Sequence, residues 1–256
     1  MITEFSEDGG TIHYAIGDVH GFLWQMQAAL RWCAEDASAR GMRGCVHLLG
    51  DYVDRGPDAK GVIECLMAGS PDPHVEWLPL RGNHDDVFAR TWQNAADPEA
   101  AGWWEHGGQQ TLMSYGWHPL HDPMPDTLSE WVPESHVAFL SSLPLVAVTP
   151  TAIFVHAGLR PGVDLRNQSS RDLMWIRGAF SGADHDFGRV VVHGHTPGSE
   201  NPKRHRGRVS MDSGCFIGGI LSAAAFDPGS AEPRFMTFGP TGRIQPTDVE
   251  GLAVKC

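Results

Sequence analysis

Carboxylate, imidazole and amide side chains recur in short glycine-rich segments of this 256-residue chain, and their chemistry is that of metal ligands. No cysteine lies among them, and oxygen and imidazole donors suit Mn, Fe or Zn rather than the thiolate type of zinc site. The residues are Asp18, His20, Asp51, Asp54, Asn83, His84, His156 and His195. Their types predict a centre that binds divalent cations through oxygen and nitrogen atoms.

Six of these residues suffice for two metal sites that share one carboxylate. Two cations held about 3.5–4 Å apart repel each other, so an anionic bridge between them is required. Asp51 is the natural candidate for this bridge, with a hydroxide as the second one. Glycines beside the ligands, such as Gly17, Gly50 and Gly194, allow the sharp turns and close approaches that bring several loops to one point.

Buried strands are expected to position these residues, because most of the groups follow an apolar run. The pattern predicts strands over 12–16, 45–49, 75–80, 152–155, 189–192, 209–211 and 219–226, and helices over 21–39 and 59–68. Strands that alternate with helices are typical of a parallel sheet, whose polar site lies beyond the carboxyl ends of its strands. The ligand candidates therefore belong to one edge of the fold.

Five blocks carry these residues in a fixed order. They are Gly17-Asp18-Val19-His20-Gly21, Gly50-Asp51-Tyr52-Val53-Asp54-Arg55-Gly56, Gly82-Asn83-His84-Asp85, His156-Ala157-Gly158 and Gly194-His195-Thr196. The set resembles the ordered motifs of the calcineurin-like metallophosphoesterases, over residues 12 to about 226. The Asp-Arg-Gly ending of the second block is similar to the corresponding motif of the phosphoprotein phosphatase branch. The chain as a whole resembles small bacterial Ser/Thr protein phosphatases.

The resemblance implies an α/β fold, a four-layer α/β/β/α sandwich of two mixed sheets flanked by helices. It also implies two divalent metal ions, Mn or alternatively Fe or Zn. One metal would be held by Asp18, His20 and Asp51. The other would be held by Asp51, Asn83, His156 and His195.

The resemblance further implies that His84 is the general acid for the leaving group and that Asp54 orients it. Arg55 would clamp the phosphate, and Asn83 would also contact the substrate. A second phosphate-binding arginine is expected upstream of the last histidine, where Trp175-Ile176-Arg177 is similar to that block. Arg81 is a further candidate for the clamp.

General chemistry agrees with these implied roles. A phosphoryl group carries its charge on equatorial oxygens, and a bidentate arginine matches that geometry. Two metals lower the pKa of a bridging water, so that hydroxide attacks in line and no covalent phosphoenzyme is needed. A leaving alkoxide requires a proton, which histidine supplies near neutral pH.

Structural roles are the alternatives for individual residues. Asp18, Asp51 and Asp85 are each suited to cap a helix after a strand. His193 lies on the same side of its strand as His195. The residue after Gly-His-Thr is Pro197, so the Gly-His-x-His arrangement of wider relatives is absent, and this favours a core or supporting role for His193 over ligation.

The chain is expected to form a single domain over residues 1–256, with a helical and loop insert at about 91–140 and a polar surface tail from about 239. Five of the nine tryptophans lie in the insert; a small satellite core is favoured for them, and a rim or lid that faces the substrate is the alternative. The basic run around 203–208 is expected to be a solvated loop.

Composition excludes several classes of protein. A hydrophobic content of 41% is too high for a disordered chain, and no apolar run approaches the about 18 residues of a membrane span. A net charge of −12 disfavours binding of long nucleic acids, which depends on many basic contacts to phosphate. The polar N-terminus indicates no signal peptide, and an odd count of scattered cysteines favours reduced thiols in a cytoplasmic protein.

The resulting hypothesis is a two-metal phosphomonoesterase, a Ser/Thr protein phosphatase, acting on a phosphorylated protein or a small phosphate ester. A symmetrical bis(5'-nucleosyl)-tetraphosphatase, acting on diadenosine tetraphosphate, is the alternative, because the metal core does not select the substrate. A non-catalytic scaffold is disfavoured since every expected ligand and the acid are present.

Overall fold

Two six-stranded sheets form the centre of the molecule in the computed structural model, which describes residues 2–5, 10–94, 102–122, 125–183 and 186–244. The first sheet has the strand order β1-β5-β6-β7-β9-β8 and the second has the order β12-β11-β10-β2-β3-β4. Both sheets contain parallel and antiparallel pairs. The two mixed sheets expected from the resemblance are confirmed.

The first sheet consists of β1 (Ile2–Glu4), β5 (Val146–Val148), β6 (Ala152–Val155), β7 (Val190–His193), β8 (Lys203–His205) and β9 (Arg208–Ser210). The second consists of β2 (Thr11–Ile16), β3 (Arg43–Leu48), β4 (Val75–Pro79), β10 (Leu221–Phe226), β11 (Arg234–Gly239) and β12 (Gly242–Ile244). Strands β2, β3 and β4 pair in parallel, as the alternation of strands and helices predicted.

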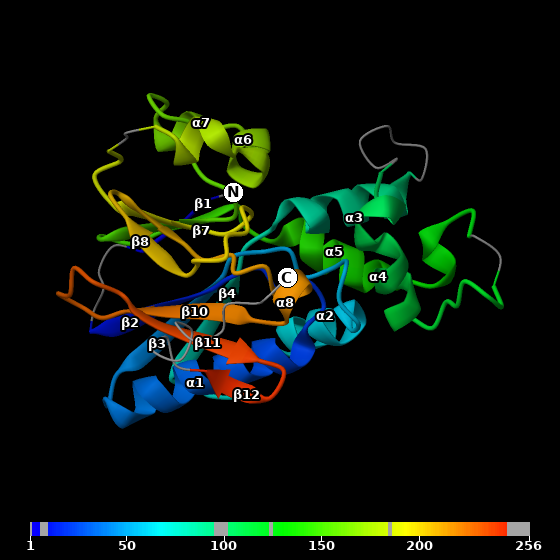
Figure 1. Ribbon diagram of the computed structural model, residues 1–256, viewed down its shortest axis with the longest axis horizontal. Coiled ribbons are helices and arrows are strands. Elements are labelled where there is room, and N and C mark those ends of the chain that lie inside the picture. The colour runs from blue at the N-terminus through cyan, green and yellow to red at the C-terminus, as the bar shows by residue number, and fades with distance from the viewer. Residues whose placement is uncertain (1, 6–9, 95–101, 123–124, 184–185, 245–256) are drawn as a thin grey trace.

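Helices cover both outer faces of the pair of sheets (Figure 1). The helices of the described residues are α1 (Leu23–Ala39), α2 (Ala59–Ala68), α3 (Asn83–Gln93), α4 (Gln109–Ser114), α5 (Glu134–Ser142), α6 (Ser170–Trp175), α7 (Gly178–Ser181) and α8 (Cys215–Gly218). Helix α1 packs on the second sheet, where Met26 and Leu30 join Tyr14 and Val46 in one core. Helices α6 and α7 pack on the first sheet through Leu173 and Phe180.

Apolar side chains fill the layer between the two sheets. Ala15 and Leu49 of the second sheet meet Phe154 and Val192 of the first. Strands buried on both faces read as nearly continuous apolar runs, which is why they were readily predicted from the sequence. His47 is an exception in this layer, where its ring stacks on Phe154 with centroids 3.8 Å apart.

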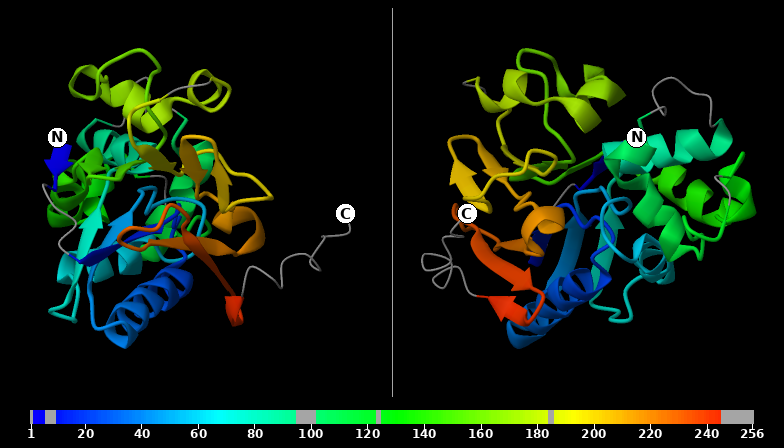
Figure 2. Two further views of the ribbon diagram at one scale, coloured as in Figure 1. Left: turned by 90° about the vertical axis from the view of Figure 1, so that its left-hand side faces the viewer. Right: turned by 45° about the vertical axis from the view of Figure 1, so that its right-hand side comes forward.

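The segment 91–140 lies to one side of the sheets, and Figure 2 shows it from a second direction. Besides the end of α3, α4 and the start of α5, it contains a π-helical turn (Trp104–Gly108) and a 3₁₀ turn (Leu128–Glu130). Its buried Trp103 and Trp117 belong to the main core and do not form a satellite core of their own. The expectation of a separate small core is therefore wrong.

Short edge strands are the main difference from the sequence-based expectations. The basic run at 203–208 is not a loop, because β8 pairs antiparallel with β9. The expected tail begins later than 239, because β12 pairs with β11. Residues 245–256 of that tail lie outside the described residues.

None of the helices in the described part of the chain has the length and the apolar character needed to cross a membrane.

An ion-pair network joins α1 to strand β11, and it gives a test of the packing. Asp36 accepts hydrogen bonds from Tyr14 Oη (2.8 Å) and from Arg234 Nη2 (2.7 Å). Burial by itself would raise the pKa of Asp36, but these hydrogen bonds outweigh it and hold the pKa below its ordinary value of 3.8. A depressed carboxyl pKa stabilises the fold above the ordinary pKa, and this contribution is lost as the pH falls below it.

We expect Asp36→Asn to lower the free energy of unfolding by about 1–3 kcal/mol at pH 7, because charge-assisted hydrogen bonds are lost. The deficit should shrink as the pH falls below 3.8, the ordinary pKa of this carboxyl. Urea unfolding at several pH values measures both effects. Glu64→Gln is the control, because the Lys60–Glu64 pair is exposed and 3.8 Å apart, and it should cost less than about 0.5 kcal/mol. Equal losses in the two variants would contradict this account.

Candidate active site

The predicted residues meet where strands of both sheets end. Asp18 follows β2 and Asp51 follows β3, while Asn83 begins α3 shortly after β4. His156 and His195 follow β6 and β7 of the other sheet. The backbone N–H of His195 donates to Asp18 Oδ2 at 3.0 Å, which joins the two sheets at this edge.

Asp51 lies at the centre of this cluster. Potential ligand atoms of Asp51, His20 and His84 lie within 4.8 Å of one another, and so do those of Asp51, His156 and His195. Asp51 therefore belongs to two groups that could each hold a cation. A third such group, made of His13, Cys45 and His47, lies elsewhere, in the layer between the sheets, and two of its ring nitrogens lie 3.0 Å apart.

Backbone carbonyls set the orientation of two of the imidazoles. His20 Nδ1 lies 2.9 Å from the carbonyl oxygen of Val53, and His156 Nδ1 lies 2.8 Å from that of Leu49. Since a carbonyl only accepts, each Nδ1 carries the proton and each Nε2 presents a lone pair. His156 Nε2 lies 2.8 Å from Asn83 Oδ1. A lone pair held beside a carbonyl oxygen suits a cation.

His84 and Asp54 form a second motif beside Asp51. His84 Nδ1 lies 2.7 Å from Asp54 Oδ2, and the backbone N–H of His84 donates to Asp51 Oδ1 at 2.9 Å. Burial by itself lowers the pKa of His84, but the carboxylates of Asp51 and Asp54 outweigh it and raise the pKa. An imidazole with a raised pKa is suited to carry a proton near neutral pH.

Arg55 reaches into the cluster from the same loop as Asp54. Its Nη1 donates to His20 Nε2 at 2.8 Å and its Nη2 donates to His84 Nε2 at 2.9 Å. The guanidinium also lies over the ring of Phe216, with Cζ 4.0 Å from the ring centroid. Arg177 lines the same cleft as Arg55, so the structure brings these two arginines to one place.

Arg81 is different, and the expectation that it clamps phosphate is not supported. Its Nη1 donates to the carbonyl oxygen of Ser141 at 3.2 Å and lies 3.6 Å from Asp86 Oδ1. It is also not among the described residues that line the cleft. Arg81 is therefore engaged with α3 and α5. His193, for which a core or supporting role is expected, is buried, and its Nε2 lies 3.2 Å from the Ser210 hydroxyl.

Backbone strain concentrates at this site. Within the described part of the chain, the non-glycine residues with positive φ are His20, Asp51, Asp54, Arg55 and His195, with φ between 45° and 71°. L-residues adopt this region rarely, and such strain clusters at functional sites. Gly82 allows the approach of the Asp51 loop, because a Cβ on it would lie 2.2 Å from Asp51 Oδ1.

The electrostatics of the cluster fit divalent cations. Burial raises the pKa of Asp18 well above its ordinary value, and repulsion from Asp212 and Asp51 raises it further. Burial lowers the pKa of His20 to about 3 and that of His195 to about 2, so both rings are neutral. His195 Nε2 is buried without a hydrogen-bond partner in the part of the chain that the structure describes. Crowded carboxylates, neutral imidazoles and an unpartnered ring nitrogen are what a metal centre needs.

Two carboxylates of the site were not predicted as functional. Asp85 accepts hydrogen bonds from the backbone N–H groups of Asp51 (2.9 Å) and Gly82 (2.9 Å), so it fastens the two loops together. Burial, with repulsion from Asp51, raises its pKa to about 7. Asp212 follows β9, and burial raises its pKa to about 6. Its position after a buried strand is the same signal that indicated Asp18 and Asp51.

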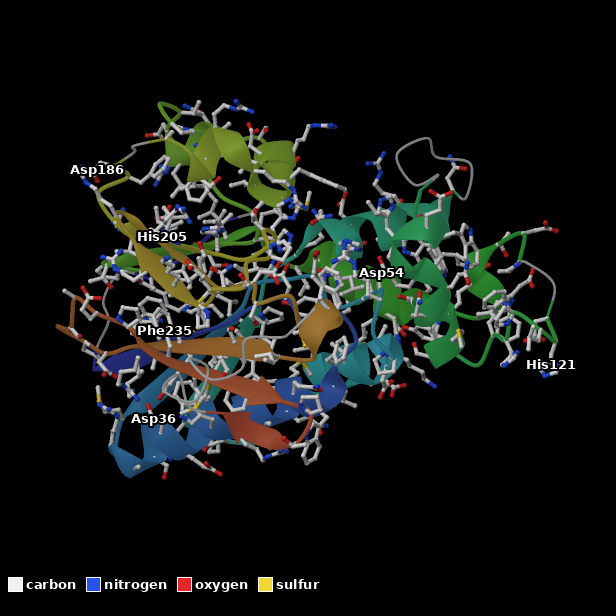
Figure 3. The ribbon with its side chains drawn as sticks, in the orientation of Figure 1. Asp36, Asp54, His121, Asp186, His205 and Phe235 are labelled. Carbon is white, nitrogen blue, oxygen red and sulfur yellow. The ribbon has the colours of Figure 1, made fainter. Side chains whose placement is uncertain are left out.

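A cleft opens beside this cluster, with a volume of about 210 Å³. It is lined by Arg55, Asn83, His84, Val87, Gly102, Trp103, His106, Trp175 and Arg177. Residues of the insert therefore face the cleft, which agrees with the alternative that the tryptophan-rich segment forms a rim. Asp54, labelled in Figure 3, lies on the side of the molecule where α3 and α4 pack.

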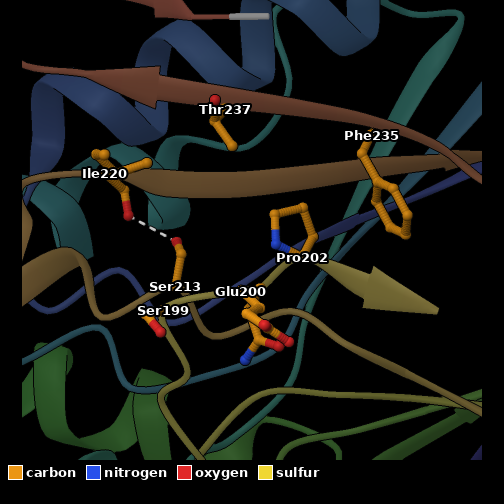
Figure 4. A pocket seen from close by; sticks show the side chains of 8 residues that line it. Ser199, Glu200, Pro202, Ser213, Ile220, Phe235 and Thr237 are labelled. Atoms are coloured by element: carbon orange, nitrogen blue, oxygen red, sulfur yellow. Dashed lines mark hydrogen bonds between the residues drawn. The ribbon is translucent and has the colours of Figure 1, made fainter. Parts of the chain in front are cut away.

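A second cavity lies apart from the predicted site residues and is shown in Figure 4. Pro202, Phe235 and Thr237 lie on its walls, and Ser213 Oγ donates to the carbonyl oxygen of Ile220 at 2.7 Å. No ligand candidate named from the sequence lines it.

Comparison with known proteins agrees with this geometry. The family model described as calcineurin-like phosphoesterase matches residues 14–220. The chain belongs to this family. It is accordingly a metal-dependent hydrolase that acts on phosphate esters, and the resemblance identified from the motif blocks is confirmed.

Relatives of this metallophosphoesterase have two kinds of name. It is 22% identical over 247 residues to an asymmetrical bis(5'-nucleosyl)-tetraphosphatase of Anoxybacillus flavithermus, covering 84% of this chain and 90% of the relative. It is 25% identical over 221 residues to serine/threonine-protein phosphatase 1 of Salmonella typhimurium, covering 82% of this chain and 90% of the relative.

Solved structures show the same fold. A putative diadenosine tetraphosphatase superposes with a TM-score of 0.63 at 20% identity, covering 94% of this chain and 99% of that one. A protein serine/threonine phosphatase from Saccharomyces cerevisiae gives a TM-score of 0.54 at 14% identity, covering 93% and 83%. The four-layer arrangement expected from the resemblance agrees with these neighbours.

The close approach of Gly194 to Asp18 gives a test of how the metallophosphoesterase centre is built. A Cβ on Gly194 would lie 2.0 Å from Asp18 Oδ1, whereas a Cβ on Gly218 would meet nothing within 4 Å. We expect Gly194→Ala to displace Asp18 and to lower both bound metal and turnover of para-nitrophenyl phosphate, the latter on the order of 100-fold.

Elemental analysis of the purified protein and initial rates measure these two effects. Gly218→Ala is the matched control and should keep the metal content and the rate of the parent. A Gly194→Ala protein with unchanged metal content would show that the Asp18 carboxylate does not need this contact.

Proposed function

We propose that this metallophosphoesterase is a two-metal phosphomonoesterase of the Ser/Thr protein phosphatase type. The observation that carries the proposal is the pairing of two elements at one edge of the fold. One is a buried aspartate, Asp51, shared by two groups of potential ligands. The other is the His84–Asp54 pair, held directly beside it. Such a combination is suited to hydroxide attack on a phosphate ester and to protonation of the leaving-group oxygen.

The proposed ligands combine the two groups around Asp51 with Asp18 and Asn83, which the family motifs add, and leave His84 as the acid. Asp18, His20 and Asp51 hold one cation, and Asp51, Asn83, His156 and His195 hold the other. Manganese is the proposed metal, with iron or zinc as alternatives, since oxygen and imidazole donors suit all three. When bound, the pair of cations supplies Lewis-acid activation of water and neutralises charge on the phosphoryl group.

The proposed general acid is His84. Its Nδ1 proton is held by Asp54 at 2.7 Å, which leaves Nε2 to face the cleft side, where Arg55 lies. Because Arg55 Nη2 donates to His84 Nε2, this nitrogen can carry a proton only once the Arg55 guanidinium turns to a bound phosphate, and the proton is then available to the oxygen of the leaving group. Protonation matters most for a poor leaving group such as the alkoxide of a serine or threonine side chain.

Arg55 and Arg177 are the proposed phosphate clamp, together with the Asn83 side chain. The Arg55 guanidinium bonds the Nε2 atoms of His20 and His84. If His20 Nε2 held a metal, Arg55 Nη1 would give up this hydrogen bond and would be free to donate to a bound oxyanion. Planar guanidinium groups match two phosphoryl oxygens at once.

A dinucleoside tetraphosphatase is the second candidate. It is favoured by the names of the relatives, one an asymmetrical bis(5'-nucleosyl)-tetraphosphatase. The symmetrical enzyme considered from the sequence differs in the position of cleavage. Trp175 is 43% exposed beside the cleft, and an exposed indole offers a stacking surface to a nucleobase.

The acidic charge of the chain argues against long nucleic acids as substrates.

The proposed compartment is the cytoplasm. It is supported by the free thiols of Cys33, Cys45, Cys65 and Cys215.

The acid assignment predicts the effect of one substitution. We expect the purified protein with added Mn²⁺ to hydrolyse para-nitrophenyl phosphate, and EDTA to abolish the reaction until Mn²⁺ is restored. His84→Asn should lower kcat for phenyl phosphate, whose leaving group is basic, on the order of 100-fold while the metal content is kept, because general acids contribute about 10²–10⁴-fold. Undiminished turnover in His84→Asn would remove His84 as the acid.

The substrate class predicts a ratio of rates. We expect kcat/KM to be higher for a phosphoserine or phosphothreonine peptide than for diadenosine tetraphosphate at equal Mn²⁺. Release of inorganic phosphate and chromatography of nucleotides measure the two reactions. The opposite ratio would favour the tetraphosphatase, and the nucleotides formed would show whether cleavage is symmetrical.

A further inference from the structure

The two oxygens of the Asp54 carboxylate have different partners. Asp54 is fully buried. Its Oδ2 faces His84 Nδ1 at 2.7 Å, whereas its Oδ1 accepts hydrogen bonds from Trp103 Nε1 (3.0 Å) and Thr111 Oγ1 (2.8 Å). Both donors to Oδ1 belong to the insert at 91–140. The insert therefore touches the group that orients the proposed acid.

Thr111 holds Asp54 twice. Its hydroxyl donates to Asp54 Oδ1, and it accepts a hydrogen bond from the backbone N–H of Asp54 at 2.8 Å. Asp54 has a strained φ of 70°, so its backbone needs partners that fix it. Thr111 is itself fully buried, and water does not compete for these bonds.

The turn between the two donors is fitted to the same loop. The carbonyl oxygen of Gly107 accepts a hydrogen bond from the backbone N–H of Arg55 at 3.1 Å. A Cβ on Gly107 would lie 2.5 Å from that nitrogen, and a Cβ on Gly108 would lie 2.4 Å from the Trp103 ring. Close packing at both glycines therefore fixes the positions of the two donors, Trp103 and Thr111, relative to Asp54.

We infer that Trp103 and Thr111 are positioning residues for the general acid, and that this turn of the insert holds Asp54 so that Oδ2 faces His84. The inference rests on the proposed function of His84. Two neutral donors on Oδ1 prevent rotation of the carboxylate and satisfy its buried charge. Without them the carboxylate is free to turn, and the His84 ring loses its fixed orientation. The insert thus positions the proposed general acid in addition to lining the cleft.

Dependence on the leaving group separates this role from a merely structural one. A general acid assists a basic leaving group more than an acidic one. We therefore compare phenyl phosphate, which releases the more basic phenolate, with para-nitrophenyl phosphate. Thr111→Val removes the hydroxyl at nearly constant volume, and Thr111→Ser keeps the hydroxyl.

We expect Thr111→Val to lower kcat for phenyl phosphate about 10-fold more than for para-nitrophenyl phosphate, with KM little changed. Trp103→Phe should shift the ratio in the same direction. Thr111→Ser should restore the ratio of the parent. His84→Asn should show the largest shift, because it removes the acid itself.

Thr91→Val is the matched control. Thr91 is also a buried threonine, but its hydroxyl donates to the carbonyl oxygen of Val87 within α3. It should leave the ratio unchanged even if stability falls. Metal content and thermal unfolding of each variant show whether a loss of rate reflects loss of the fold, and the ratio itself is insensitive to the folded fraction.

Equal losses on both substrates in Thr111→Val and Trp103→Phe, with the expected shift in His84→Asn, would overturn this inference alone. No shift in His84→Asn would overturn the acid assignment and this inference with it. Absence of any Mn²⁺-dependent turnover in the parent protein would instead refute the proposed phosphomonoesterase.

Discussion

A single buried carboxylate, Asp51, holds the site together. Its Oδ1 accepts the backbone N–H of His84, and its own N–H donates to Asp85. Burial by itself would raise the pKa of Asp51, but its interactions with the surrounding imidazoles, with His156 first, outweigh it and lower the pKa. A charge in this place is stable only if cationic or polar groups surround it. The convergence of loops from both sheets meets this requirement.

Two features of the fold bring these loops together: the strands end at one edge, and glycines allow the loops to approach closely. Parallel strands carry Asp18 and Asp51 to the same edge of one sheet, while His156 and His195 arrive from the other. Gly82 and Gly194 let backbone approach carboxylate without a side chain between them. The insert then closes the site on the side of Asp54. Family membership explains the metal-binding edge, and the insert supplies Trp103 and His106 to the lining of the cleft beside it.

The sequence predicted most of the strands and ligand candidates at the edge of the fold, but few of the residues that surround them. Strands β2, β3, β6 and β10 could be found because burial on both faces leaves largely apolar runs, and those of β2 and β3 are followed by Gly and Asp. Strand β8 could not, because Lys203–His205 is polar and its ladder depends on β9. The two partners of Asp54 in the insert, Trp103 and Thr111, lie 49 and 57 positions away along the chain, so no local pattern indicates them. The contact of Arg81 with Ser141 could not be foreseen for the same reason, since the two residues become neighbours only after folding.

The left-handed backbone at Asp51, Asp54, Arg55 and their two neighbours in the site has a consequence for protein engineering. Each such residue costs on the order of 1–3 kcal/mol, which glycine at the same position would largely recover. Glycine at these positions would relieve the backbone strain but would also remove the side chains of the site and leave their buried hydrogen-bond donors, such as Trp103 Nε1, without a partner. Variant libraries designed to raise thermal stability should therefore keep these residues unchanged. They should vary helices away from the site, such as α1, where stability and turnover do not compete.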